Sequence, residues 1–204
     1  NLAVDAFALN DTFVVDKIRL QGDLPTSTTT PTQMRATLNG LRVAGREIKQ
    51  GEMTLSGQYN AHVLKLSGTT SRSSQFKVQL AGGFNQANDW LGQIQNGQFK
   101  SDNNNLVQNK FAVVRYSRKQ QQLLVGEHCW MSRQSQLCMD EPLRLSSNKA
   151  HVSLVTQNVD LNDFATFMPE GLSLTGQVNG YAKASWAKGQ KPNLDARLVT
   201  RNGT

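Results

Sequence analysis

Long hydrophobic runs and charged side chains are both scarce in this chain of 204 residues. The longest apolar runs, such as Phe111 to Val114, fall far short of the roughly 18 residues that a membrane-spanning helix requires. Hydrophobic residues make up only 38% of the chain, against about 45–50%, counting glycine, in an average globular domain. Gln, Asn, Ser and Thr take their place, which is typical of strands that keep one face in water.

Motifs that carry catalysis are absent as well. The sequence contains no Gly-x-Ser-x-Gly elbow, no Gly-x-Gly-x-x-Gly turn, no phosphate-binding loop and no His-Glu-x-x-His pair. Its three histidines lie far apart, and a Ser/His/Asp triad, which converges only in space, is the arrangement that the sequence leaves open. We predict that the protein is not an enzyme and that it uses neither a metal ion nor a cofactor.

Acidic side chains are in the minority, because 22 Lys and Arg face 15 Asp and Glu, a formal net charge of +7. The basic residues are scattered, and their densest run is Arg115 to Lys119. A basic balance can serve solubility, an anionic membrane or a nucleic acid. We interpret it as solubility, with an anionic membrane surface as the next alternative, and we expect no nucleic-acid partner.

Cysteine occurs only twice, as Cys129 and Cys138, on either side of a polar stretch typical of a turn. Two strands paired across this turn would allow a disulfide, worth about 2.5–3 kcal/mol in the chain-entropy model. Such a bond indicates an oxidising compartment outside the cytosol. The alternative is a zinc site made of His128, Cys129, Cys138 and His151, but structural zinc pairs are usually about two to four residues apart. The spacing favours the disulfide.

Alternation of apolar and polar residues predicts an all-β fold of antiparallel strands, with 1–204 as a single segment. The clearest strand is 172–186, which at about 3.3 Å per residue would be roughly 50 Å long. Residues 25–32 form a loop in this interpretation, because they contain two prolines and lack an apolar period. Apolar residues spaced by three and four over 161–168 predict one short helix that plugs the space between strands.

Small residues fill much of the apolar side of the predicted 172–186 strand, namely Gly176, Gly180, Ala182 and Ala184. Glycine weakens a strand that packs against a second sheet, whereas small side chains avoid collisions on the concave side of a strongly curved sheet. The pattern alone fits an open, curved trough and a closed barrel or sandwich equally well.

Several motifs follow one another in a recognisable order: Trp90-x-Gly92-x-Ile94, Cys129-Trp130 with Cys138, Leu161-x-x-Phe164, Met168-Pro169, Leu172-x-Leu174-x-Gly176-x-x-x-Gly180, Trp186 and Pro192. This order resembles the TamB-type proteins, the inner-membrane subunits of the translocation and assembly module of Gram-negative bacteria, within the AsmA-like group. The resemblance covers most of the chain and is weakest before about residue 46. Met168 stands where leucine is more usual in the family.

The resemblance implies a periplasmic segment of a longer protein, anchored in the inner membrane by a helix outside this chain. An excised or mature segment also fits the start of the sequence at Asn1, which lacks the features of a signal peptide. The implied fold is a long, strongly curved antiparallel sheet, folded like a taco around an apolar groove. The implied partners are an outer-membrane barrel protein and either phospholipid or an extended outer-membrane protein strand.

Alternation by itself places apolar side chains on one face at a set of candidate groove positions. We expect this groove to shelter phospholipid tails, or nascent outer-membrane protein strands, between the two membranes. The alternatives are a chaperone that binds by strand addition and a structural spacer. The candidate groove residues are Leu172, Leu174, Val178, Ala182, Ala184, Trp186, Leu194 and Leu198, together with Leu55, Leu64, Leu66, Val78 and Leu80.

Overall fold

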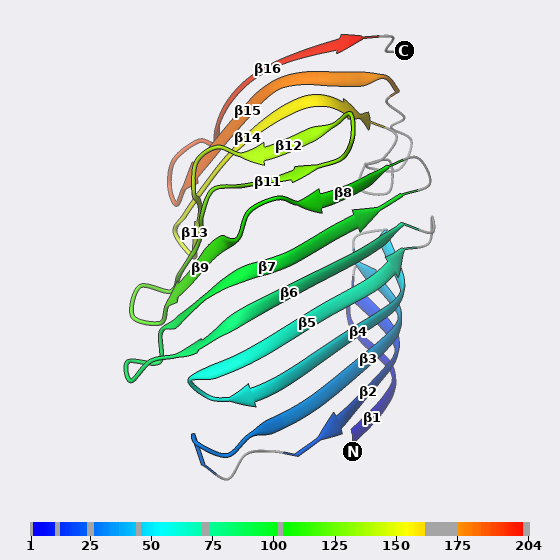
Figure 1. The fold of residues 1–204 in the computed structure, drawn as a ribbon, viewed down its shortest axis with the longest axis vertical. Helices are drawn as coiled ribbons and strands as arrows, with labels where there is room; N and C mark the ends of the chain where they lie inside the picture. Colours follow the sequence, from blue (N-terminus) through cyan, green and yellow to red (C-terminus); the bar gives the residue numbers. More distant parts are fainter. Residues whose placement is uncertain are drawn as a thin grey trace.

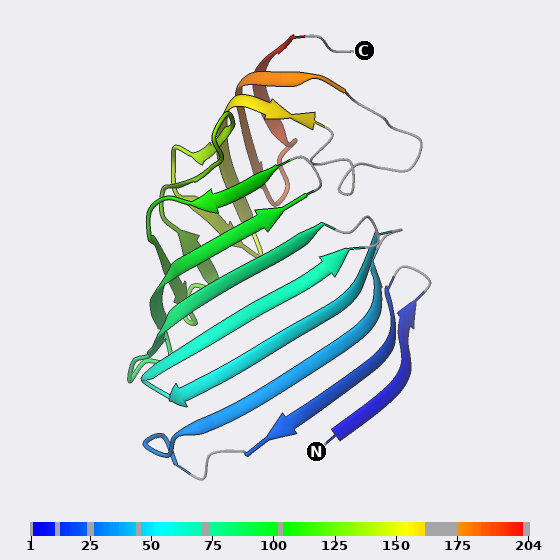
Figure 2. The ribbon, with the colours of Figure 1, turned by 45° about the vertical axis from the view of Figure 1, so that its right-hand side comes forward.

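The computed structural model describes residues 2–10, 13–23, 27–43, 46–70, 74–101, 104–161 and 175–201. The described residues form one antiparallel sheet of sixteen strands (Figure 1). Figure 2 shows that the strands curve along their length and that β1 and β16 lie at opposite ends of the sheet. The predicted all-β fold built on one large, curved antiparallel sheet is therefore confirmed.

The first half of the sheet is a simple meander in which each strand pairs with the next, from β1 to β8. The turn at residues 59–60 lies where the apolar parity of the sequence changes, between β4 and β5. The strands of this half are β1 (Leu2–Asn10), β2 (Phe13–Gly22), β3 (Thr32–Val43), β4 (Arg46–Gln58), β5 (Ala61–Thr70), β6 (Gln75–Phe84), β7 (Trp90–Lys100) and β8 (Asn105–Gln108).

The second half contains a fork. One edge of β7 pairs with both β8 and β9, and one edge of β14 pairs with both β12 and β13. The strands between β7 and β14 are short because irregular segments separate them. One such segment contains Pro142, which has no N–H to give to a ladder. These strands are β9 (Ala112–Ser117), β10 (Gln122–Val125), β11 (His128–Met131), β12 (Gln136–Met139), β13 (Leu143–Ser146), β14 (Lys149–Asp160), β15 (Gln177–Ala187) and β16 (Asn193–Arg201).

The register of the ladders separates two faces of the sheet, because directly paired residues of antiparallel strands point to the same side. Leu55 pairs with Leu64, and Leu64 with Leu80; Leu66 pairs with Val78. We call the side that carries these five residues the apolar face. The opposite side carries Glu52, Thr54, Lys65, Ser67, Lys77 and Gln79, and we call it the polar face.

A hydrophobic core cluster lies on the apolar face, next to the fork. Ala112, Val114 and Val125 are buried there, and one direct ladder joins Val114 to Gly92 and to Val125. Four partly buried side chains pack against these three, from β7, β10 and β13: Trp90, Ile94, Leu123 and Leu143. The cluster thus packs side chains of β7, β9, β10 and β13 together beside the fork.

Several elements differ from those that the sequence predicted. The long strand begins at Gln177 rather than at 172, because Thr175 and Gly176 precede it and Gly176 adopts a φ of 101°, a conformation that favours glycine and interrupts a strand. The predicted helix over 161–168 lies outside the described residues except for Leu161. Within the predicted loop 25–32, residues 27–30 form a turn and Thr32 already belongs to β3. Among the described strands β1 and β16 each pair on one edge only, so none of the described pairings closes the sheet into a barrel.

Candidate functional site

The apolar face forms cross-strand rows on strands β3 to β7. One row runs from Met34 through Leu55, Leu64 and Leu80 to Ile94, each residue directly opposite the next. A second row contains Met53, Leu66 and Val78. The side chains of both rows are half-buried, so neighbouring strands cover their sides while part of each remains accessible. Five predicted groove residues, Leu55, Leu64, Leu66, Val78 and Leu80, lie together in these rows.

Aromatic side chains lie across glycines on the same face. A Cβ atom added at Gly92 would meet the Trp90 ring at 2.4 Å, and one added at Gly97 would meet the Trp130 ring at 2.4 Å. On β5, a Cβ atom added at Gly68 would meet the Phe76 ring at 2.6 Å. Glycine is therefore needed at these positions because a ring occupies the space of its missing side chain. Alternation does not predict these contacts, although the Trp90-x-Gly92 spacing was a signal for the first of them.

The remaining groove candidates lie at the other end of the sheet, on β15 and β16. Val178 is buried, with 5% of its surface exposed, and pairs with Val159 and Thr200. Ala182 and Ala184 are half-buried, whereas Trp186, Leu194 and Leu198 are 39%, 70% and 54% exposed. Ala184 lies opposite Leu194, and Gly180 opposite Leu198. Leu172 and Leu174 lie outside the described residues.

The two groups of candidates share one face of the sheet. Leu80 pairs with Ile94, and Ile94 with Ala112 on β9. Tyr116, which has the same parity on β9, leads through Leu123, Leu145 and Ala150 to Trp186 on β15. The candidate groove residues that the structure describes thus lie on one side of the sheet, in two groups separated by the packed cluster around Val114.

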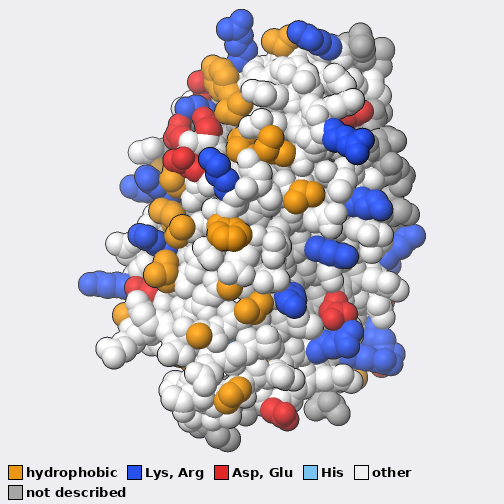
Figure 3. Space-filling model, in the orientation of Figure 1, with side chains coloured by type: hydrophobic (Ala, Val, Ile, Leu, Met, Phe, Trp, Pro, Cys, Tyr) orange, Lys and Arg blue, Asp and Glu red, His pale blue; other side chains and the backbone are white. Residues whose placement is uncertain are grey.

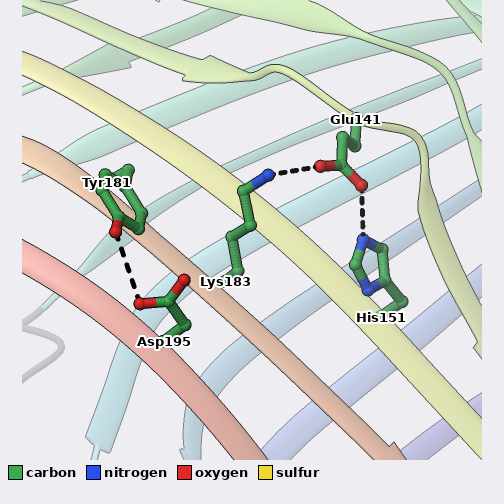
Figure 4. Close-up of polar contacts among 5 residues, drawn as sticks. All are labelled: Glu141, His151, Tyr181, Lys183 and Asp195. Atoms are coloured by element: carbon green, nitrogen blue, oxygen red, sulfur yellow. Dashed lines mark hydrogen bonds and ion pairs between the residues drawn. The ribbon is translucent and has the colours of Figure 1, made fainter.

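A polar cluster lies between β14, β15 and the segment before β13 (Figure 4). Glu141 accepts a hydrogen bond from Nζ of Lys183 at 2.6 Å, and its other carboxylate oxygen is 2.9 Å from Nε2 of His151. The bond from Lys183, followed by the contact with His151, lowers the pKa of Glu141 below its ordinary value. The same bond raises the pKa of Lys183. At neutral pH Glu141 and Lys183 form an ion pair. This pair and the contact with His151 hold the segment that contains Pro142 against β14 and β15.

Cys129 and Cys138 form a disulfide, as the sequence predicted, between directly paired positions of β11 and β12. Both sulfur atoms are therefore unavailable as thiolate ligands, which removes the zinc alternative. His151 instead contacts Glu141, and Nδ1 of His128 lies 2.9 Å from the Gly126 carbonyl oxygen. Across the described ranges there is no group of three or more His, Cys, Asp or Glu side chains that could hold a metal ion.

None of the helices in the described part of the chain is long and apolar enough to cross a bilayer. The disulfide, the half-buried apolar rows and the long curved sheet are the described features from which a function can be argued.

Comparison with known proteins gives a match over the whole chain. A family model described as "TamB, N-terminal domain" matches residues 1–204. The chain is also similar to the translocation and assembly module subunit TamB of Haemophilus influenzae, with 24% identity over 138 residues. That alignment covers 66% of this chain and 10% of the length of the relative. No solved structure matches the chain.

Proposed function

Since the chain belongs to the TamB N-terminal domain family, whose model matches residues 1–204, we propose that it is a segment of an envelope-spanning carrier. In this proposal the parent protein is anchored in the inner membrane and this segment lies in the periplasm. It acts, without catalysis, in the translocation and assembly module, together with an outer-membrane barrel partner, and supports assembly of the outer membrane.

We infer that the cargo of this segment is the acyl part of phospholipid, held against the apolar face. The observation that carries the inference is the row Leu55, Leu64 and Leu80, whose members are directly paired and only half-buried. Each methylene group that leaves water for such a surface gains about 0.8 kcal/mol. Because the row crosses several strands without a charged side chain, a lipid tail can rest at successive positions with similar free energy.

The disulfide supports the proposed location, because disulfides persist in oxidising compartments such as the periplasm. The curvature of the sheet supports the proposed groove, because a bent sheet can place the half-buried rows of neighbouring strands around a chain-like ligand. Leu172 and Leu174 belong to the proposed groove by alternation alone.

Native mass spectrometry of the purified protein tests the lipid proposal. We expect phospholipid adducts on the wild type, and a strong loss of adducts in Leu55→Asp, which places a charge in the row. Ser56→Asp is the matched control, since Ser56 is the next residue on β4 and lies on the polar face. Val178 is a poor probe because its burial makes a charge there incompatible with folding.

The lipid proposal is wrong if the wild type carries no phospholipid, or if Leu55→Asp and Ser56→Asp retain the same amount. Circular dichroism of both variants shows whether the sheet is intact. A functional assay with the full-length protein then separates a carrier from a structural spacer, because a spacer tolerates Leu55→Asp and responds only to changes in length.

A second candidate function is capture of an extended outer-membrane protein strand by strand addition. The observation that favours it is β16, whose nine residues are all exposed and which pairs only with β15 among the described strands. Val199→Lys tests this candidate, because an edge lysine blocks strand pairing and Val199 lies on the face opposite Leu198. Strand addition predicts that Val199→Lys abolishes binding of a β-barrel-derived peptide while Leu55→Asp does not.

A further inference from the structure

Strands β8 and β9 carry apolar side chains on both faces. Ala112 and Val114 are buried on the apolar face, with 0% and 5% of their surfaces exposed. Their neighbours Phe111 and Val113 are exposed. An uninterrupted apolar run in a strand is typical of a sheet that is covered on both sides. Here the chain covers one side of residues 112–114 and leaves the other side open.

The open side continues onto neighbouring strands as an exposed apolar patch, which we define as Leu91, Val107, Phe111, Val113 and Met131. Their exposed fractions lie between 36% and 63%. Val107 pairs with Gln98 and Met131, and Val113 pairs with Gln93, which places these side chains on the polar face. Figure 3 shows this face, on which separate hydrophobic side chains lie with basic side chains among them. Several large apolar side chains exposed on one face of neighbouring strands mark a candidate interaction surface.

Basic side chains border the patch. Arg115 lies directly opposite Leu91, and Arg144 lies two strands further along the same row, after Leu124. Lys110 is exposed beside Phe111. None of these three makes an ion pair within the part of the chain that the structure describes.

A depression of about 550 Å³ joins the other border of the patch. Val107 lines it together with Lys65 and Lys77, and these two lysines also lack an ion-pair partner among the described residues. The acidic residue in the depression, Glu52, is already paired with Arg35 at 2.8 Å. Among the side chains that line the depression, the uncompensated charge is therefore positive.

We propose that this side of the sheet docks on the surface of an anionic phospholipid bilayer. The five apolar side chains enter the boundary between head groups and acyl chains, and the surrounding Lys and Arg side chains meet the phosphate groups. A second copy of the chain fits less well, because it would bring like charges together around the apolar contact. The docking surface lies on the face opposite the proposed lipid groove, so the inference does not rest on the proposed function.

Vesicle flotation tests the docking surface. We expect the purified protein to float with vesicles of phosphatidylglycerol and phosphatidylcholine, and to bind pure phosphatidylcholine vesicles at least about fivefold more weakly. Binding to the anionic vesicles falls at roughly 0.5 M salt, where charges are screened over a few ångströms. Equal binding to both kinds of vesicle, or no binding to either, overturns the proposal.

Paired variants locate the binding on the molecule. Phe111→Ser combined with Val113→Ser weakens binding to anionic vesicles by about tenfold, since two inserted side chains are lost. Leu194→Ser is the matched control, because Leu194 is 70% exposed but lies on the opposite face. Arg115→Glu is a second probe, which keeps the apolar patch and reverses one border charge.

Unchanged binding in the serine double variant and in Arg115→Glu overturns the proposal, provided that circular dichroism shows an intact sheet. Concentration-dependent dimers in the ultracentrifuge that disappear in the serine variant, without vesicle binding by the wild type, assign the patch to a second copy instead. If the docking proposal is correct, Leu55→Asp binds anionic vesicles as the wild type does, whether or not it carries phospholipid adducts, so failure of the groove and failure of the docking surface are distinguishable.

Discussion

The indole N–H of Trp90 on β7 donates a hydrogen bond to Nε2 of His62 on β5, at 2.8 Å, across the intervening strand β6. Gly82 lies between them on β6, directly opposite His62, and its missing side chain leaves room for the Trp90 ring. Indole is a donor only, so Nε2 accepts and Nδ1 carries the proton toward the Gln58 carbonyl oxygen, 3.1 Å away. A tryptophan, a histidine and a glycine thus join three strands on the apolar face.

Replacing Trp90 by phenylalanine removes the donor and leaves the His62 nitrogen without its partner. We expect Trp90→Phe to lower the free energy of unfolding by about 0.5–1.5 kcal/mol more than Trp130→Phe does. Trp130 is the matched control because its ring also lies over a glycine, while its indole makes no hydrogen bond in the described ranges. Urea unfolding of both variants measures the difference, and equal losses would contradict the role assigned to the bond.

Alanine at Gly82 places a methyl group against the Trp90 ring. The added Cβ atom would lie 2.5 Å from the Leu91 carbonyl oxygen and 2.7 Å from the Trp90 ring. Because backbone cannot move away easily, we expect Gly82→Ala to destabilise the protein by about 1–3 kcal/mol. Gly126→Ala is the control, since its nearest neighbour is at an ordinary 3.4 Å. Thermal unfolding should show a clearly lower midpoint for Gly82→Ala alone.

The Cys129–Cys138 disulfide closes a short loop between two paired strands. Replacing both cysteines by alanine should lower the free energy of unfolding by about 2.5–3 kcal/mol, because the unfolded chain regains the entropy of the open loop. The double variant avoids a free thiol that could form wrong disulfides. Unfolding of the wild type with and without a reductant provides the check: a reductant should destabilise the wild type and leave the double variant unchanged.

The contacts of Glu141 make the stability of the folded protein depend on pH in the acidic range. The folded-state pKa of Glu141 is lowered, so its contribution is complete above the ordinary carboxyl value of 4.5 and is lost as the pH falls through the lower folded value. The pKa of Lys183 is raised, so its contribution persists at neutral pH and disappears only above its ordinary value of 10.5. We expect Glu141→Gln to be less stable than the wild type at pH 7.

The difference between Glu141→Gln and the wild type should shrink as the pH falls well below 4.5, since the wild-type carboxyl group is then also neutral. Unfolding midpoints of the two proteins across the acidic range measure this convergence. A constant difference at every pH would show that the glutamine acts through packing and not through the lost charge.

The local features of this protein follow from its amino-acid pattern alone. Period-two alternation predicted strands because a strand exposes successive side chains to opposite faces, and Leu55, Leu64, Leu66, Val78 and Leu80 obey it in the structure. The spacing of Cys129 and Cys138 around a polar turn predicted the disulfide, since a hairpin needs nothing beyond its own residues. The order of these features was also sufficient to identify the resemblance to the TamB-type proteins.

Which strands share an edge, and which side chains lie over which glycines, depends on the folded sheet. The fork at β7 and β14, the bond between Trp90 and His62 and the bond between Lys183 and Glu141 all join residues that are far apart in the chain. Alternation cannot show them, because it reports the face of a side chain and not its neighbours across strands. For the same reason alternation could not show that the sheet places one side of the apolar run from Phe111 to Val114 in the packed cluster and leaves the other side open.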